Sequence, residues 1–365
     1  MVKIGIVGVG YEIGIAQFHV KAYQLMEDAT ITAVYDVIPA RAQEYITRFG
    51  LHHAVCCESY EQLLGLVDAV SICTPNSTHV PLAIQAIEAN KHVLCEKPFA
   101  PSAEDCAALV TLSKNSSTVQ MIGLCYRGIP AYRMLKDMIK QGELGEIYYT
   151  RQSMGGGRIG NPTVELEWRM QKELSGPGAI ADFGSHMLDL CDWILSETYG
   201  KLQEFSCMAG TFIKERKRQD DTGESGIVTN DDVAQFIAKT TGGVLCSFNA
   251  SRIGGNHTFE IFGSKGQVSF TGNSFAINKI ISGPAGSSVE VVEVTESSYL
   301  GAPEQARVPF LINFYQEIRE FLDLIQNGGE TEIDFARGHY IQQLIDAVQQ
   351  AADEGKTVTL KEVQA

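Results

Sequence analysis

The sequence has little of what marks several large classes of protein. Its nine cysteines are odd in number and include no C-x-x-C pair, so we expect free, mostly buried thiols in a reducing compartment. Basic residues number 29 against 44 acidic ones, and the net charge of −15 argues against nucleic acid and anionic membranes as partners. No apolar run reaches transmembrane length, and no signal peptide precedes the first strand. We therefore expect a cytoplasmic protein.

The chain does have enough apolar material for two cores. It contains 365 residues, of which 44% are hydrophobic, and chains of this length usually divide into domains. We find no internal repeat and no low-complexity segment. We predict a first domain over residues 1–125 and a second over residues 126–365, with the helices from about residue 310 packing back on the first domain.

Strands and helices alternate along the first domain. This pattern predicts an α/β fold with a doubly wound parallel sheet and helices on both faces. The expected strands are Val2–Val7, Thr30–Tyr35, Ala69–Cys73, His92–Cys95 and Val119–Gly123, and the expected helices are Phe18–Met26, Ala40–Phe49, Val80–Ala89 and Ala103–Lys114.

Short strands with hairpin signals dominate the second domain, which predicts a mostly antiparallel sheet. One long helix is expected at about Ala181–Leu195 and two amphipathic helices at Phe310–Asn327 and Gly338–Glu354. Arg216–Ser225 is polar and charge-rich, and we expect a solvated, mobile loop there. The predicted strands are Tyr148–Gln152, Glu204–Phe212, Asp232–Lys239, Val244–Asn249, Phe259–Phe262 and Gln267–Thr271.

A glycine-rich turn follows the first strand. Gly8, Gly10 and Gly14 precede a helix, where bare backbone lets a pyrophosphate approach free N–H groups. The usual spacing is G-x-G-x-x-G, so the third glycine comes one residue late, unless Ala16 takes its packing role in a longer turn. We predict a dinucleotide site; the alternative is a glycine turn without a ligand.

Asp36 ends the second strand of the first domain. A carboxylate there can accept hydrogen bonds from the adenosine ribose and would repel a 2′-phosphate, so we favour NAD over NADP. Arg41 lies near enough to keep NADP open. The alternative for Asp36 is a solvated turn.

Polar residues also follow the third strand. We assign Thr74, Pro75, Asn76 and His79 to cofactor binding, because ligands of such sheets lie beyond the carboxyl ends of the strands. Asn76 could instead cap the following helix, and His79 could lie on the surface of that helix.

The segment Cys95-Glu96-Lys97-Pro98 places a lysine at the end of a buried strand. We assign Glu96 and Lys97 to the cofactor crevice. An ammonium group held there can stabilise a developing alkoxide or carry a proton. The alternative is a surface lysine in a turn.

A second glycine-rich loop, starting at Gly176, leads into a helix that carries Asp182 and His186. The spacing of four places both side chains on one helix face. Histidine can take a hydroxyl proton near neutral pH, and the carboxylate could orient it or bind substrate. A helix-capping aspartate beside a buried structural histidine is the alternative. With no third ligand nearby and no Cys/His cluster, we predict no metal.

Three further residues are candidates for substrate contacts, namely Arg127, Trp168 and Arg169. Trp168 and Arg169 precede the glycine loop and could line a sugar pocket or clamp a cofactor. A core tryptophan beside an ion-paired arginine fits them equally well.

With these motifs assembled, the chain resembles the glucose–fructose oxidoreductase / inositol dehydrogenase / MocA family. The resemblance runs nearly end to end. It rests on the Gly8-x-Gly10 turn, Asp36, Thr74-Pro75-Asn76 with His79, Lys91 to Pro98, Trp168-Arg169, the run to Asp182-x-Gly-x-His186, Gly263 to Gly266, and Ala352 to Val358.

The resemblance implies a Rossmann domain joined to an α/β domain with a large open, mostly antiparallel sheet. In such proteins that sheet forms the subunit interface, so a homodimer or homotetramer is expected. Lys97, Asp182 and His186 would carry the acid/base work, and Lys97–Pro98 is expected to be a cis peptide bond. The long loop Gly155–Pro162 leaves the shape of the substrate pocket open.

The sequence therefore predicts an NAD-dependent oxidoreductase acting on a secondary hydroxyl of a sugar or cyclic polyol. We expect Lys97 and His186 to converge on that hydroxyl. One alternative is a glycoside hydrolase that uses NAD for transient oxidation without net redox change. Another is a non-catalytic NAD(H)-binding protein.

Overall fold

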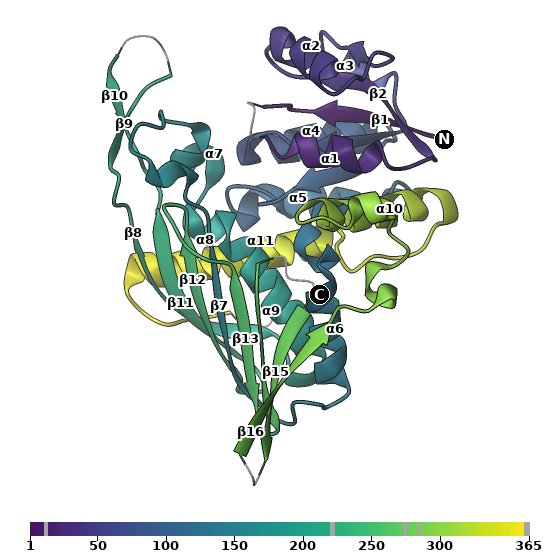
Figure 1. Ribbon diagram of the computed structural model, residues 1–365. Helices are drawn as coiled ribbons and strands as arrows, with labels where there is room; N and C mark the ends of the chain where they lie inside the picture. Colours follow the sequence, from purple (N-terminus) through teal and green to yellow (C-terminus); the bar gives the residue numbers. More distant parts are fainter. Residues whose placement is uncertain (11–13, 220–222, 273–275, 284–285, 361–365) are drawn as a thin grey trace. The chain divides into compact units, whose positions relative to one another are not determined.

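The computed structural model describes residues 1–10, 14–219, 223–272, 276–283 and 286–360. Contacts within the chain divide it into two compact units. The first contains Met1–Gly128 and Gly301–Tyr340, and the second contains Ile129–Leu300 and Ile341–Ala365. The division falls inside one long helix, α11 (Phe335–Glu354). Figure 1 shows the chain coloured along its sequence.

A six-stranded parallel sheet forms the centre of the first unit, in the order β3-β2-β1-β4-β5-β6. The prediction of a doubly wound α/β fold is confirmed, since the strand order reverses between β1 and β4. The strands are β1 (Val2–Val7), β2 (Ala29–Tyr35), β3 (Val55–Cys56), β4 (Ala69–Ile72), β5 (His92–Glu96) and β6 (Gln120–Gly123). The helices are α1 (Ala16–Tyr23), α2 (Pro39–Arg48), α3 (Tyr60–Leu64), α4 (His79–Glu88), α5 (Ala103–Lys114) and α10 (Leu311–Asn327). The 3₁₀ turns are η1 (Asn76–Thr78), η2 (Cys125–Gly128) and η6 (Glu304–Ala306).

The central strands are buried on both faces, which is why they appear in the sequence as nearly continuous apolar runs. Every residue of β4 is buried, and so are all but one of β1. Gly5 of β1 has no side chain at a position where a Cβ would lie 2.6 Å from Leu63 of α3. Close packing of this helix therefore depends on that bare position.

Helix α10 packs against α1, although about 290 residues separate them in the sequence. The rings of Phe18 and Phe314 stack with centroids 5.2 Å apart. The guanidinium of Arg319 donates to both carboxylate oxygens of Asp28, at 2.9 and 2.7 Å. This contact lowers the pKa of Asp28 to about 2. The first unit is thus closed by a segment from the far end of the chain.

A nine-stranded mixed sheet forms the second unit, in the order β16-β15-β14-β13-β7-β12-β11-β8-β17. All neighbours are antiparallel except β7 and β12, so the mostly antiparallel sheet is confirmed. Its strands are β7 (Ile147–Gly155), β8 (Leu202–Gly210), β11 (Val233–Thr240), β12 (Leu245–Ser251), β13 (Thr258–Gly263), β14 (Gly266–Thr271), β15 (Ala276–Gly283), β16 (Gly286–Glu293) and β17 (Val358–Thr359).

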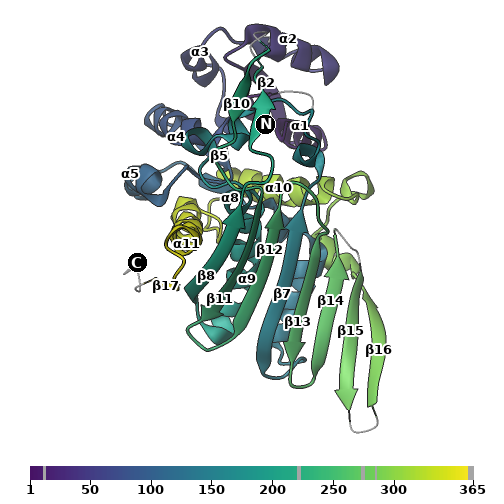
Figure 2. The same ribbon diagram turned by 90° about the vertical axis from the view of Figure 1, so that its left-hand side faces the viewer.

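The nine-stranded sheet has one covered face and one open face. Helices α6 (Pro130–Lys140) and α9 (Gly184–Tyr199) pack together, and α9 contacts β7 and β12. Alternate residues of β11 are buried and exposed along its length, as expected for a strand with one covered face. Figure 2 shows α9 behind these strands and the open face toward the viewer. The remaining short elements are η3 (Arg158–Gly160), η4 (Trp168–Met170), α7 (Lys172–Ser175), α8 (Ala179–Asp182) and η5 (Glu296–Tyr299).

The prediction of a mobile loop at Arg216–Ser225 is wrong at both ends of this segment. Strands β9 (Glu215–Lys217) and β10 (Ser225–Ile227) form an antiparallel pair. Arg216 is buried because its guanidinium donates to the carbonyl oxygens of Ile159, Asn161 and Val164. A charged residue is solvated in most sequences, but three backbone acceptors allow this one to be buried.

All nine cysteines are free and six of them are buried, so the prediction of unpaired, mostly buried thiols is confirmed. Among the described residues, no helix combines the length and apolarity needed to cross a membrane.

His257 gives the second unit an acid-sensitive contact. Its Nε2 lies 3.0 Å from the Tyr132 hydroxyl, and burial lowers its pKa from 6.5 to about 4. The folded state disfavours the charged imidazole. As the pH falls below about 6.5, the unfolded chain therefore takes up a proton at His257 that the folded chain does not. The free energy of unfolding should therefore fall by about 1–3 kcal/mol as the pH drops from about 6.5 to 4. Urea unfolding across this range measures it.

The variant His257→Gln isolates this contribution, since glutamine does not titrate. Its unfolding free energy should lose that part of the pH dependence. Identical pH slopes in the variant and the wild-type chain would show that His257 does not cause it.

Candidate functional site

The candidate residues of the first unit gather at one edge of its parallel sheet. Gly8 follows β1, Asp36 follows β2, Thr74 lies two residues beyond β4, and Lys97 follows β5. These strands are neighbours in the order β2-β1-β4-β5, and parallel strands end at the same edge. The reversal of strand order lies between β1 and β4, where ligands of such sheets bind.

The glycine turn is shaped by close backbone packing. Gly8 has φ +81°, and a Cβ there would lie 2.4 Å from Cγ2 of Thr74. Gly10 has φ +62°, and a Cβ there would have no atom nearer than 3.8 Å. The first glycine therefore lets the ends of β1 and β4 approach, and the second leaves backbone uncovered. The unusual spacing to Gly14 passes through residues 11–13, which lie outside the described residues.

Asp36 supports this turn directly. Its Oδ2 accepts hydrogen bonds from the backbone N–H groups of Val9 and Gly10, at 3.1 and 3.3 Å, and its Oδ1 accepts one from Ile38. The side chain is buried. Bare backbone beside a buried carboxylate at the switch point suits a dinucleotide with free ribose hydroxyls.

His79 joins the ends of β4 and β5. It is fully buried, with Nδ1 3.0 Å from the carbonyl oxygen of Pro98 and Nε2 2.9 Å from that of Thr74. Burial lowers its pKa. Since both ring nitrogens face backbone, we interpret His79 as holding these two ends in place for a cofactor. The neighbouring Asn76 is also buried.

The Lys97–Pro98 peptide bond is cis, which confirms the expectation drawn from the family resemblance. Lys97 itself is partly buried, and its backbone N–H donates to Oε2 of Glu96 at 3.2 Å. Glu96 is buried and its other oxygen lies 2.8 Å from Nε2 of His19. The lysine is thus anchored through its main chain to a buried carboxylate.

Arg127 lies in η2, which follows β6 at the same sheet edge. The side chain is buried, and its guanidinium lies 3.6 Å from the carboxylate of Glu332. It therefore has an acidic partner within the first unit.

The candidate residues of the second unit lie around the glycine loop. The expected single helix is divided in two: α8 ends at Asp182 and α9 begins at Gly184. The amide of Met187 still donates to the carbonyl of Phe183 at 3.2 Å, so the helical path continues through the junction. Asp182 and His186 therefore remain about one turn apart, and His186 is buried.

Asp182 lies among arginine side chains. Its carboxylate interacts electrostatically with Arg158 and Arg169. Burial lowers the pKa of Arg169, and the charges of Asp182 and Glu167 oppose that shift. The guanidinium of Arg169 also stacks over Trp168, 4.3 Å from the ring centroid. The structure thus brings Trp168, Arg169 and Asp182 together.

Sequence reasoning missed the residues that hold this loop. Asp231 accepts hydrogen bonds from the N–H groups of Gly178 and Ile180, at 2.6 and 3.0 Å. Asn230 donates to the carbonyl oxygens of Arg169 and Gly176 and to Oγ of Ser175. The run Asn230-Asp231-Asp232 before a strand was the available signal, but the glycine-loop groups that Asn230 and Asp231 bind lie more than 50 residues away.

Gly178 is the position of this loop most sensitive to substitution. A Cβ there would lie 1.8 Å from the carbonyl oxygen of Asp231 and 2.8 Å from the guanidinium of Arg252, and the Asp231 backbone cannot move aside as a flexible side chain would. We expect Gly178→Ala to lower the free energy of unfolding by about 1–3 kcal/mol and to reduce activity by displacing Asp182. Urea unfolding and steady-state kinetics measure the two effects. Gly157→Ala, with no atom within 4 Å of the added Cβ, is the matched control; equal behaviour of both variants would contradict the expectation.

The parallel sheet with its glycine turn and acidic β2 end defines a Rossmann-type dinucleotide-binding unit, and the second unit carries a large open sheet. Comparison with known families agrees. The profile of an oxidoreductase family with an NAD-binding Rossmann fold matches residues 2–124, and that of the GFO/IDH/MocA C-terminal domain matches residues 132–269. The chain belongs to the GFO/IDH/MocA family, and it is an NAD-dependent oxidoreductase.

Individual relatives span the whole chain. Levoglucosan dehydrogenase of Pseudarthrobacter phenanthrenivorans is 27% identical, with 100% of this chain and 99% of the relative covered. Glucose-6-phosphate 3-dehydrogenase of Bacillus subtilis is 26% identical, with 95% of each covered. A solved structure of levoglucosan dehydrogenase with NADH and L-sorbose has a TM-score of 0.89 at 24% identity, with 100% of both chains covered. That likeness establishes the fold.

Proposed function

We propose that this protein oxidises a secondary hydroxyl of a sugar or cyclic polyol, with NAD as the hydride acceptor. The observation that carries the proposal is the placement of Lys97 at the carboxyl end of β5, next to the end of β4 and at the same sheet edge as the glycine turn that follows β1. Its relatives named levoglucosan dehydrogenase and inositol 2-dehydrogenase act on substrates of this class.

The choice of NAD over NADP rests on Asp36. Its buried carboxylate already accepts three backbone hydrogen bonds, so it is fixed in place at the end of β2. A fixed negative charge favours ribose hydroxyls and repels a 2′-phosphate. Arg41, in α2, is the nearby cation that could weaken this preference.

The proposed chemistry assigns one role to each of three residues. NAD⁺, when bound, supplies the hydride acceptor. His186 takes the proton of the hydroxyl as general base, because an imidazole titrates near working pH. Lys97 donates a hydrogen bond to the same oxygen and stabilises its developing negative charge. Asp182 orients the imidazole or a neighbouring hydroxyl.

Substrate contacts are proposed for Trp168 and Arg169, and for Arg127. The indole stacked with a guanidinium offers an apolar face next to hydrogen-bond donors, a combination that suits the alternating CH and OH groups of a sugar. Arg127 would contribute only if its contact with Glu332 rearranges.

The test of this function is a substrate panel followed by absorbance of NADH. Myo-inositol, levoglucosan, glucose, glucose 6-phosphate and an amino sugar are offered with NAD⁺ and, in parallel, with NADP⁺. We expect NADH to accumulate with at least one of them and NADP⁺ to support a lower kcat/KM. Release of p-nitrophenol from aryl glycosides without NADH would favour glycoside cleavage instead. Nucleotide binding with no turnover of any compound would favour a non-catalytic protein.

We further propose that the open face of the nine-stranded sheet forms the interface of a homodimer or homotetramer. Met208, Ile237 and Leu245 are 84, 57 and 56% exposed, although each is apolar. A groove of about 940 Å³ crosses the same strands and is lined by residues such as Gln235, Ile237 and Ser247. Exposed apolar surface of this kind marks association sites.

Ile237→Asp tests this interface. We expect the charge to weaken association by about 30-fold or more, as for a central interface residue. Light scattering coupled to gel filtration measures the mass across a dilution series. Leu66→Asp, an exposed leucine of the first unit, is the control; an unchanged mass for Ile237→Asp would place the interface elsewhere.

A cytoplasmic location is also proposed. Nine free cysteines would favour a reducing compartment, since an oxidising one promotes disulfide formation.

A further inference from the structure

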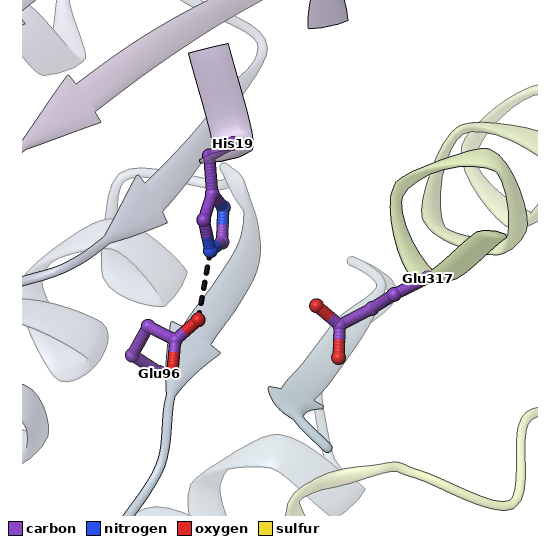
Figure 3. Close-up of side chains that lie close together, drawn as sticks. All are labelled: His19, Glu96 and Glu317. Carbon is purple, nitrogen blue, oxygen red and sulfur yellow. Dashed lines mark hydrogen bonds and ion pairs between the residues drawn. The ribbon is translucent and has the colours of Figure 1, made fainter. Parts of the chain in front are cut away.

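Three buried ionisable side chains meet inside the first unit, outside the chemistry proposed above. They are His19 of α1, Glu96 at the end of β5, and Glu317 of α10. One ligand atom from each lies within 4.8 Å of the others. All three residues are at most 4% exposed. Figure 3 shows the imidazole hydrogen-bonded to Glu96 and the carboxylate of Glu317 directed toward them from the opposite side.

The hydrogen bonds within this cluster leave Glu317 without a partner. Nε2 of His19 lies 2.8 Å from Oε1 of Glu96, and Oε2 of Glu96 accepts from the Lys97 amide. Neither carboxylate oxygen of Glu317 has a hydrogen-bond partner among the described residues. A buried carboxylate costs several kcal/mol unless something compensates its charge.

The electrostatics of the same place disfavour a second ionised carboxylate beside the first. Burial raises the pKa of Glu317 well above its usual range, and the nearby charges of Glu96 and Glu320 add to the shift. The Cys125 thiol responds in the same way: burial raises its pKa first, followed by the charges of Glu317 and Glu96. Two carboxyl groups and one imidazole meet here, and a divalent cation between them would compensate two carboxylate charges.

We propose that His19, Glu96 and Glu317 bind a divalent transition-metal ion. One imidazole nitrogen and two carboxylate oxygens suit Zn²⁺ or Mn²⁺ better than Ca²⁺ or Mg²⁺. Ligand distances of about 2.0–2.2 Å place opposite ligand atoms at most about 4.4 Å apart. The cluster, with its widest separation within 4.8 Å, needs only a small closure to reach that geometry.

The position of the cluster suggests what the ion does. It would join α1, which follows the glycine turn, to the end of β5, which precedes Lys97, and to α10. The ion would therefore have a structural role. No pattern in the sequence reveals the site, because its three ligands are separated by 77 and 221 residues.

Titration of the full-length protein with Zn²⁺, after removal of bound metal with EDTA, tests the proposal. We expect one equivalent to bind and to raise the Tm. Glu317→Gln keeps the shape but removes the ligand charge, and should weaken binding by more than about 100-fold, since even residues that only support metal ligands contribute about 10–100-fold. His52→Asn/His53→Asn, which removes two exposed imidazoles, is the control and should keep the site.

Two outcomes would overturn the site. One is a wild-type protein that binds no Zn²⁺, in which case a proton or a water molecule is left to satisfy the carboxylates. The other is binding that survives Glu317→Gln but is lost in the double histidine control. If Glu317→Gln fails to fold, anomalous diffraction at the zinc edge from wild-type crystals soaked in Zn²⁺ locates the ion directly; density away from the cluster rejects the proposal.

Discussion

Replacing Lys97 with alanine should reduce kcat by about 10²–10⁴-fold while NAD⁺ binds nearly as well as to the wild-type protein. The loss follows from the removal of a charged hydrogen-bond donor at the reacting oxygen, where such a group acts mainly on the transition state. The backbone N–H of Lys97 is held by a hydrogen bond to Glu96. Since that anchor uses backbone atoms, the variant should retain the local fold.

Matched measurements separate a catalytic effect from a structural one. Steady-state turnover with the best substrate of the panel is compared with the Kd for NADH, measured by fluorescence. Lys91→Ala is the control, because Lys91 directly precedes β5 and so lies at the opposite edge of the sheet. Near-normal turnover by Lys97→Ala would remove Lys97 from the mechanism, and a large loss of NADH affinity would show that it chiefly binds cofactor.

The elements of the first unit could be predicted closely because their signals are local. The strand Val2–Val7 and the helix Ala103–Lys114 have the predicted bounds. An apolar run defines the strand, and Ser102, which accepts a hydrogen bond from the Asp105 amide, begins the helix. Periodicity and capping depend on neighbouring residues only, so a single sequence contains them.

The second unit shows where such signals fail. Strand β16 was not predicted, although Val289 and Val291 alternate with other residues. Both valines are exposed, so the apolar residues of this strand do not face a core. Hydrophobic patterning identifies a strand by assuming that its apolar residues are the buried ones. The prediction of a solvated loop at Arg216 was wrong because a charged residue is assumed to be exposed. Here the guanidinium is buried, and it donates to backbone carbonyl oxygens of a distant loop.

The candidate site divides in the same way. Motifs pointed to Asp36 and Lys97 because each directly follows a strand that the sequence reveals. Asp231 and Glu317 could not be found, since their importance comes from groups about 50 and 220 residues away. Residues that bind a ligand often belong to a recognisable segment, whereas the residues that hold the segment in place come from elsewhere in the fold.

Replacing His186 with glutamine should have an effect of the same size as Lys97→Ala, with kcat lowered by about 10²–10⁴-fold. Glutamine is close in size and can keep a hydrogen bond in the buried position, but it cannot accept a proton at working pH. If His186 is the general base, wild-type oxidation should weaken as the pH falls through the pKa of the imidazole, because the protonated ring no longer takes the hydroxyl proton. The variant should lose that limb of the pH profile.

The measurement is log kcat against pH in the direction of NADH formation, for the wild-type protein and both histidine variants. His257→Gln is the matched control, since it changes stability at acid pH but belongs to no proposed chemical step. A catalytic role predicts a low, flat profile for His186→Gln and an unchanged profile for His257→Gln wherever the latter is folded. A profile of wild-type shape in His186→Gln, even at reduced rate, would assign the titrating base to another group and leave His186 a structural residue of α9.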